Sequence, residues 1–95
     1  MLVMDVRNCF AREWSHVLST TNDLAELEAF RLRVGAPPQA LHLKNPRRPH
    51  LDLKGEARRR ALASPDVLVF ERTADLLRYL HRLNGRAGKG RGGGS

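Results

Sequence analysis

The chain has 95 residues, of which 41% are hydrophobic and 28% are charged, and these proportions are normal for one small globular domain. No apolar run approaches the roughly 20 residues that a bilayer crossing needs. The first residues, Met1 to Asp5, lack the basic start of a signal peptide, and the single cysteine, Cys9, excludes an internal disulfide. We therefore expect a cytoplasmic protein without membrane association.

The net charge of +7 is unevenly distributed along the chain. Residues 44–60 hold 7 basic and 2 acidic side chains, and residues 84–95 add three basic side chains and no acidic one. Such clustering is typical of a protein that binds a polyanion. A solvated helix face followed by a solubilising tail accounts for the same charge equally well.

The first half of the chain predicts two strands and a helix. Leu2–Val6 has the composition of a short buried strand, and Trp14–Ser19 alternates so that Trp14, His16 and Leu18 share one face. Asp23, followed three residues later by Glu26, resembles a capping box at the start of a helix. The stripe of this helix consists of Leu24, Leu27, Phe30 and Val34, and Gly35 is placed to end it.

The second half predicts two further strands and two further helices. We expect a third strand at Ala40–Leu43, a loop at Asn45–Pro49, an extended segment at Leu51–Leu53, a helix at Lys54–Ala63 and a strand at Val67–Phe70. Thr73 is expected to cap a last helix with a stripe of leucines, and Asn84-Gly85 is expected to stop it.

This order, β-β-α-β-α-β-α, predicts a small single α/β domain over residues 1–83. We expect a mixed or mostly parallel sheet of three to four strands with three helices, and a disordered Gly/Arg/Lys-rich tail over residues 84–95. Ligands of such sheets tend to bind at the carboxyl ends of strands, and His16 lies near one such end. The predicted core consists of Leu2, Met4, Val17, Leu24, Leu27, Phe30, Leu41, Val67, Val69, Leu76 and Leu80.

Five short motifs follow one another along the chain: a first strand ending at an aspartate, a W-S-H strand, a capped helix with E-L and a final glycine, an H-[YL]-D-[LI] motif and an R-R-x-A helix. In this sequence they are Leu2–Asp5, Trp14–Leu18, Glu26–Gly35, His50–Leu53 and Arg59–Ala61. In their order and spacing these motifs resemble those of a small bacterial and phage family classed only as a domain of unknown function. The resemblance covers about residues 1–83, and it implies no established activity.

The sequence departs from that family's pattern at three positions. Thr20 stands where the family usually has an Asp, Glu28 replaces a His, and Leu51 replaces the Tyr of an H-Y-D motif. If the family's polar positions form a catalytic site, the resemblance implies that part of the site is missing here.

The candidate catalytic residues are His16, His50, Asp52 and Asp5. Imidazole and carboxylate groups together can carry out acid–base chemistry or bind a divalent metal. No histidine pair has a compact ligand spacing, so we predict no metal site and no cofactor. A structural role is the favoured alternative: Asp52 would cap the helix that follows it, and His50 would hydrogen-bond a backbone carbonyl. His42 and His81 match no motif.

The candidate polyanion-binding residues are Arg47, Arg48, Lys54, Arg58 and Arg59. The first hypothesis is a non-enzymatic module that binds nucleic acid or an acidic protein through residues 44–60 and the tail. The alternative is a small metal-dependent hydrolase- or nuclease-like enzyme that uses His16, His50 and Asp52. The separation of the His16 and His50 rings discriminates between them, since rings more than about 10 Å apart cannot share one metal.

Overall fold

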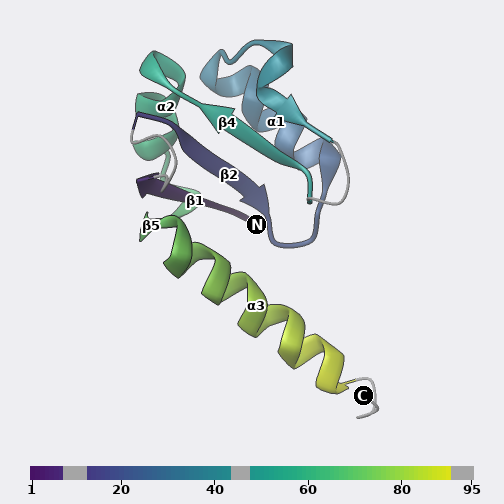
Figure 1. Cartoon of the computed structure of the whole chain (residues 1–95). Helices are drawn as coiled ribbons and strands as arrows, with labels where there is room; N and C mark the ends of the chain where they lie inside the picture. The colour runs from purple at the N-terminus through teal and green to yellow at the C-terminus, as the bar shows by residue number, and fades with distance from the viewer. Residues whose placement is uncertain (8–12, 44–47, 91–95) are drawn as a thin grey trace.

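The computed structural model describes residues 1–7, 13–43 and 48–90, and the side chains up to residue 83. It contains one five-stranded mixed sheet, three α-helices and a short 3₁₀ turn, η1 (Figure 1). In chain order the elements are β1 (Leu2–Arg7), β2 (Ser15–Ser19), α1 (Leu24–Val34), η1 (Pro38–Ala40), β3 (Leu41–His42), β4 (His50–Leu53), α2 (Gly55–Leu62), β5 (Val67–Arg72) and α3 (Thr73–Gly90).

The sheet has the strand order β3-β4-β2-β1-β5, and only the β1–β5 pair is parallel. The expected α/β class and the mixed sheet are confirmed, whereas a mostly parallel sheet of three to four strands is wrong. The segment around Leu51–Leu53 is a full strand, β4, which raises the number of strands to five. Helices α1 and α2 do join strands of the same direction, as crossover connections require. The strands of each pair are not neighbours, because β4 lies between β2 and β3, and β2 and β1 lie between β4 and β5.

Helices α1 and α2 pack on one face of the sheet and enclose its larger core. The buried members of this core are Leu2, Met4, Val17, Leu27, Phe30, Val34, Ala36, Ala40, Leu51, Leu53, Ala61 and Val67. Burial of Leu51 and Leu53 follows from the alternation of β4, since side chains two apart share a face. Two expected core residues are wrong: Leu24 is 46% exposed at the start of α1, and Val69 is 39% exposed on the edge strand β5.

The predicted ends of α1 are confirmed. Asp23 accepts a hydrogen bond from the backbone N–H of Glu26 at 3.2 Å, which is half of the expected capping box. Gly35 adopts the left-handed conformation with φ 76°, and its N–H bonds back to the last turn of the helix. A glycine adopts this conformation without steric cost, and its position therefore ends the helix.

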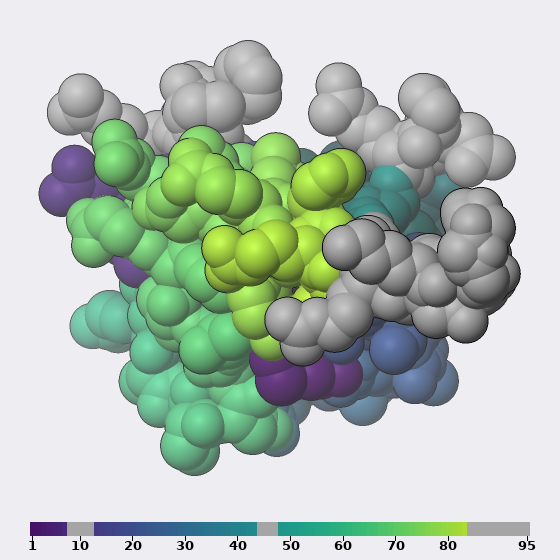
Figure 2. Space-filling view, turned by 90° about the horizontal axis from the view of Figure 1, so that it is seen from below, coloured from purple at the N-terminus to yellow at the C-terminus, as the bar shows by residue number. Residues whose placement is uncertain are grey.

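Helix α3 lies on the opposite face of the sheet and covers only part of it. It packs against β1 and β5, where Leu76 and Leu80 bury Val3 and Leu18. Figure 2 shows the green surface of α3 from below, with the purple N-terminal residues emerging beside it. The helix continues to Gly90, past the Asn84-Gly85 pair where we expected its end, and disorder of the tail stays a prediction. None of the helices in the described ranges has the length and apolar content of a membrane span.

Candidate functional site

Polar side chains gather on the part of the α3 face that α3 leaves uncovered. In the ladder between β2 and β4, His16 lies directly opposite Asp52, and Leu18 lies opposite His50. In the ladder between β3 and β4, His42 lies opposite His50. Residues from three strands, β2, β3 and β4, therefore meet because the strands are paired in this register. The side chains of directly opposite residues are close enough to touch.

Asp5 and His16 form a dyad at the inner border of this polar region. The Asp5 carboxylate is fully buried and accepts hydrogen bonds from the backbone N–H of His16 at 2.7 Å and from Thr73 Oγ1 at 2.6 Å. Its Oδ2 also lies 3.0 Å from His16 Nδ1. Burial by itself raises the pKa of Asp5, but the hydrogen bonds from His16 and Thr73 outweigh it and hold that pKa below its ordinary value. Asp5 is therefore an anion that fixes the His16 ring.

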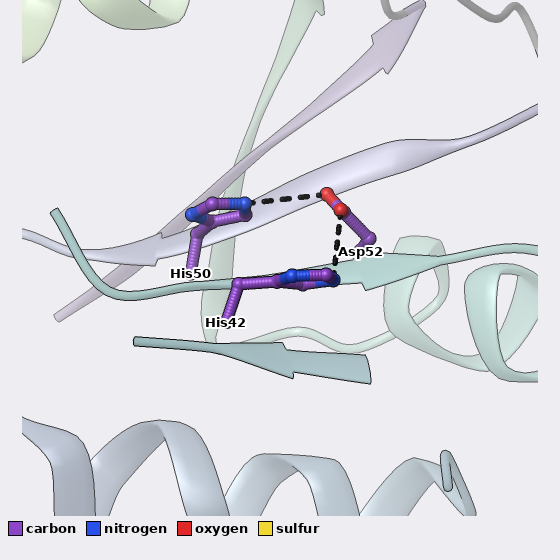
Figure 3. A group of neighbouring side chains, drawn as sticks. All are labelled: His42, His50 and Asp52. Carbon is purple, nitrogen blue, oxygen red and sulfur yellow. Dashed lines mark ion pairs between the residues drawn. The ribbon is translucent and has the colours of Figure 1, made fainter. Parts of the chain in front are cut away.

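Asp52 lies at the centre of three imidazoles. His42 Nε2 is 3.1 Å from Asp52 Oδ2, and His50 Nε2 is 3.6 Å from Asp52 Oδ1 (Figure 3). His16 Nε2 approaches the same Oδ1 to 3.7 Å. The His16 and His50 ring centroids are 5.6 Å apart, and the His42 and His50 rings stack at 5.2 Å. The separation of His16 and His50 is well within the limit for rings that serve one site.

The tautomers of His16 and His50 follow from what their Nδ1 atoms face. Nδ1 of His50 lies 3.0 Å from the carbonyl oxygen of Arg48, and Nδ1 of His16 faces the Asp5 carboxylate. Both partners can only accept, so each Nδ1 carries the proton and, in a neutral ring, each Nε2 carries a lone pair. Both Nε2 atoms point towards Asp52 Oδ1, which is also an acceptor. A positive charge between them, either a proton or a metal ion, would relieve this repulsion.

The environment of Asp52 Oδ1 also indicates that a positive charge, a proton or a metal ion, belongs at this place. This oxygen is buried and has no hydrogen-bond partner in the described part of the chain, since His16 and His50 lie beyond hydrogen-bond length. A buried carboxylate oxygen without a partner is costly. Burial raises the pKa of Asp52, yet the nearby imidazoles, first His50 and then His16 and His42, hold it below its ordinary value. The carboxylate is therefore ionised and available as a ligand.

His42, His50 and Asp52 have the geometry of a metal-binding group. One ligand atom from each lies within 4.8 Å of the others. Ligands that bind one zinc ion at about 2.0–2.2 Å are about 3.3 Å from one another in a tetrahedron. Each imidazole approaches its own oxygen of Asp52 to a similar distance, His42 at 3.1 Å from Oδ2 and His50 at 3.6 Å from Oδ1. The hydrogen bond from His50 to the Arg48 carbonyl is also the kind of outer contact that orients metal-binding histidines.

Several expectations about this site are corrected by the structure. Asp52 does not cap α2: Lys54 is the N-cap residue, without a side-chain hydrogen bond, and the Asp52 carboxylate faces the histidines. His16 lies in the first half of β2, on a face of the sheet, and not at a carboxyl end of the strands. His42, which sequence reasoning set aside, belongs to the cluster. A usable signal was present, because Leu41-His42-Leu43 alternates in the same way as His50–Leu53.

The predicted polyanion-binding residues that the structure describes differ in their exposure and in their contacts. Arg58 is partly buried, and its guanidinium donates to Ser15 Oγ at 2.8 Å and to the Val6 carbonyl at 2.5 Å. Arg59 is exposed and pairs with Glu56. Lys54 is exposed, with its Nζ 4.9 Å from the centroid of the Trp14 ring. Arg48 is half-buried, and Arg47 lies outside the described residues.

Searches against protein-family models, curated proteins and solved structures found no match for the chain. The resemblance to a domain of unknown function therefore stays an expectation.

Proposed function

We propose that this domain is a small metal-dependent hydrolase that binds one divalent ion of the zinc class through His42, His50 and Asp52. The observation that carries the proposal is the buried Oδ1 of Asp52, which has no hydrogen-bond partner among the described residues and faces two imidazole nitrogens. Nitrogen and carboxylate ligands of this kind suit zinc. Three protein ligands leave a coordination position for water, as in catalytic zinc sites, and the ion would lower the pKa of that water.

In this proposal His16 is the general base. Its Nδ1 is held by the Asp5 carboxylate, and its Nε2 faces the ligand Asp52 from 3.7 Å. An imidazole oriented in this way can take a proton from an attacking water molecule, and the Asp5 anion stabilises the resulting imidazolium. Thr73, at the start of α3, fixes the other end of the dyad through its hydrogen bond to Asp5.

Metal binding is tested by calorimetric titration of Zn²⁺ into chelator-treated protein. We expect one ion per chain, and we expect the His42→Ala and Asp52→Asn variants to lose more than about 100-fold in affinity, because even outer contacts of a metal site are worth about 10–100-fold. His81→Ala is the matched control, since His81 is exposed on α3. Absence of zinc binding would overturn the proposal.

The role of His16 is tested separately with activated p-nitrophenyl esters of acetate and phosphate. We expect His16→Ala to keep zinc binding and to lose about 100-fold or more in zinc-dependent turnover, the usual contribution of a general base. A variant that loses zinc binding as completely as His42→Ala would instead make His16 a fourth ligand, and the site a closed structural one.

Polyanion binding is a second proposal, supported by one feature of α2. Arg59 and Arg60 are both exposed and share a single carboxylate, Glu56, which leaves an excess positive charge on the solvent face of the helix. Nucleic-acid binding would then fall steeply with salt, and replacing both arginines with glutamine would reduce the slope of log K against log salt by about 0.7–0.9 per lost contact. A mobility-shift assay at low salt that shows no binding by the unmutated protein would exclude it.

A further inference from the structure

A cavity of about 670 Å³ adjoins the metal-binding group. Strand β4 is longer than β3, and its last residues, Asp52 and Leu53, have no partner in β3. The turn η1 lies opposite these two residues, and the cavity is at this place. His42 and Asp52 both line it. A volume of this size is within the usual range for a small-molecule site, about 300–1,000 Å³. A ligand in the cavity would therefore touch His42 and Asp52, two of the three proposed metal ligands.

The wall of the cavity is mainly apolar and includes one lysine. Its apolar lining consists of Trp14, Ala36, Pro37, Ala40, Leu53 and Ala57. The charged members of the lining are Asp52, on the side of the metal-binding group, and Lys54, whose Nζ lies 4.9 Å from the Trp14 ring centroid. These groups suit a ligand that combines an apolar, ring-sized part with an anionic group.

We infer that the substrate is a small phosphate monoester of an apolar, ring-bearing alcohol, an inference that rests on the proposed metal-dependent hydrolysis. The phosphate group would lie between the His42–Asp52 side of the cavity and Lys54, and the ring would lie against the apolar wall. A phosphate monoester carries a charge of about −1.5 to −2 near neutral pH, which matches a divalent ion together with a lysine. A neutral carboxylic ester would gain nothing from Lys54. The net charge of +7 favours an anionic ligand in the same way.

The reaction needs no co-reactant other than water. A water molecule attacks phosphorus, one of its protons moves to His16 Nε2, and a new P–O bond forms. The P–O bond to the alcohol breaks, and its electron pair leaves with the alcohol oxygen, which then takes up the proton. The products are inorganic phosphate and the free alcohol.

The cavity contains its own reporter, because Trp14 is the single tryptophan of the chain. Its fluorescence can be followed in EDTA and with Zn²⁺ while three probes are titrated: phenylphosphonate, methylphosphonate and benzyl alcohol. Phenylphosphonate has both a ring and a non-hydrolysable anionic group. Methylphosphonate has only the anionic group, and benzyl alcohol has only the ring. We expect phenylphosphonate to bind at least about tenfold more tightly than either, the effect of one charge-assisted contact, and Zn²⁺ to tighten it further.

Lys54→Gln should weaken phenylphosphonate binding about tenfold and leave benzyl alcohol unchanged. Arg78→Gln is the matched control, because it removes the same charge from an exposed position on α3 and should change neither. Equal affinities for phenylphosphonate and methylphosphonate, or an unaffected Lys54→Gln variant, would overturn the inference. So would a Trp14 signal that only an oligonucleotide changes.

Failure of the inference and failure of the proposed function give different results. If Zn²⁺ binds and phenylphosphonate leaves Trp14 unchanged, the metal site stands and the substrate inference is overturned. If Zn²⁺ does not bind, the hydrolytic reaction is overturned. Phenylphosphonate binding in EDTA would then still support a ring-bearing anion as the ligand of the cavity.

Discussion

The face of the sheet that carries α3 has two halves with opposite chemistry. Over β1 and β5, Leu76 and Leu80 of α3 bury Val3 and Leu18 in a dry apolar contact. Over β2, β4 and β3, the same face carries His16, His50, Asp52 and His42, which are 17–47% exposed. Val3, Leu18, His50 and His42 follow one another across the strands. Helix placement therefore decides which part of the face packs and which part remains open for chemistry.

The apolar half should contribute most to stability. Leu76 is fully buried, so Leu76→Ala removes its packing against the sheet and leaves a cavity. We expect a loss of about 2–5 kcal/mol in the free energy of unfolding, measured by denaturant titration. A loss below about 1 kcal/mol would mean that α3 is only loosely attached and that the two halves differ less than described.

Asp5 at the border between the halves should give the next largest effect. Asp5→Asn replaces a buried anion that accepts from His16 and Thr73, and we expect a loss of about 1–3 kcal/mol at pH 7. Because the folded-state pKa of Asp5 is lowered, its contribution is full above the ordinary pKa of about 3.9 and is lost as the pH falls through the folded value. The difference between variant and wild type should therefore shrink below about pH 4. A constant difference down to pH 2 would contradict the assignment.

Two neighbouring arginines on α2 test what supports the polar half. Arg58 joins the end of β1 to the start of β2 through Val6 and Ser15, next to Asp5 and His16. Arg58→Gln should cost about 1–3 kcal/mol, because it leaves these partly buried acceptors without a charged donor. Arg59→Gln is the matched control on the same helix and should change stability by less than about 0.5 kcal/mol, as exposed ion pairs do. The two stability losses are compared by thermal unfolding of both variants in parallel. Equal losses would show that Arg58 does not support the polar half of the sheet.

The smallest effect on stability is expected at His42, despite its role in the proposed metal site. His42 is 47% exposed on the two-residue strand β3, so His42→Ala should change the unfolding free energy of metal-free protein by less than about 0.5 kcal/mol. Denaturant titration in EDTA measures it. A loss comparable to that of Leu76→Ala would show that the polar half is a structural element of the fold.

The parts of the fold that local sequence determines could be predicted. Asp23 and Gly35 set the ends of α1 through their own backbone preferences, and the alternation of apolar and polar residues in His50–Leu53 accounts for the burial of Leu51 and Leu53. The order of strands could not be predicted, because alternating helices and strands fix the direction of the joined strands and not which strand lies between them. Leu24 and Val69 were wrongly expected in the core. Periodicity does not show that the first residue of a helix faces solvent or that a strand lies at the edge of the sheet.

The candidate site was predicted in part for the same reason. His16, His50, Asp52 and Asp5 were identified, and the structure brings all four together with His42. Asp52 was misread as a helix cap, because its position just before α2 suits capping and only the sheet register reveals the histidines that face it. A search for ligands at fixed spacing within one segment misses a site assembled across strands.

The pairing of β4 with its two neighbours has a consequence for how this protein could be monitored during folding. Side chains alternate with a period of two along a strand, so a shift of β4 by one residue would turn His50 and Asp52 into the core and bring Leu51 and Leu53 to the open face. No such misaligned form could place two imidazoles around the carboxylate. Metal binding would therefore report only the molecules in which β4 is correctly aligned with its neighbours. It would distinguish them from misaligned molecules that have the same overall content of secondary structure.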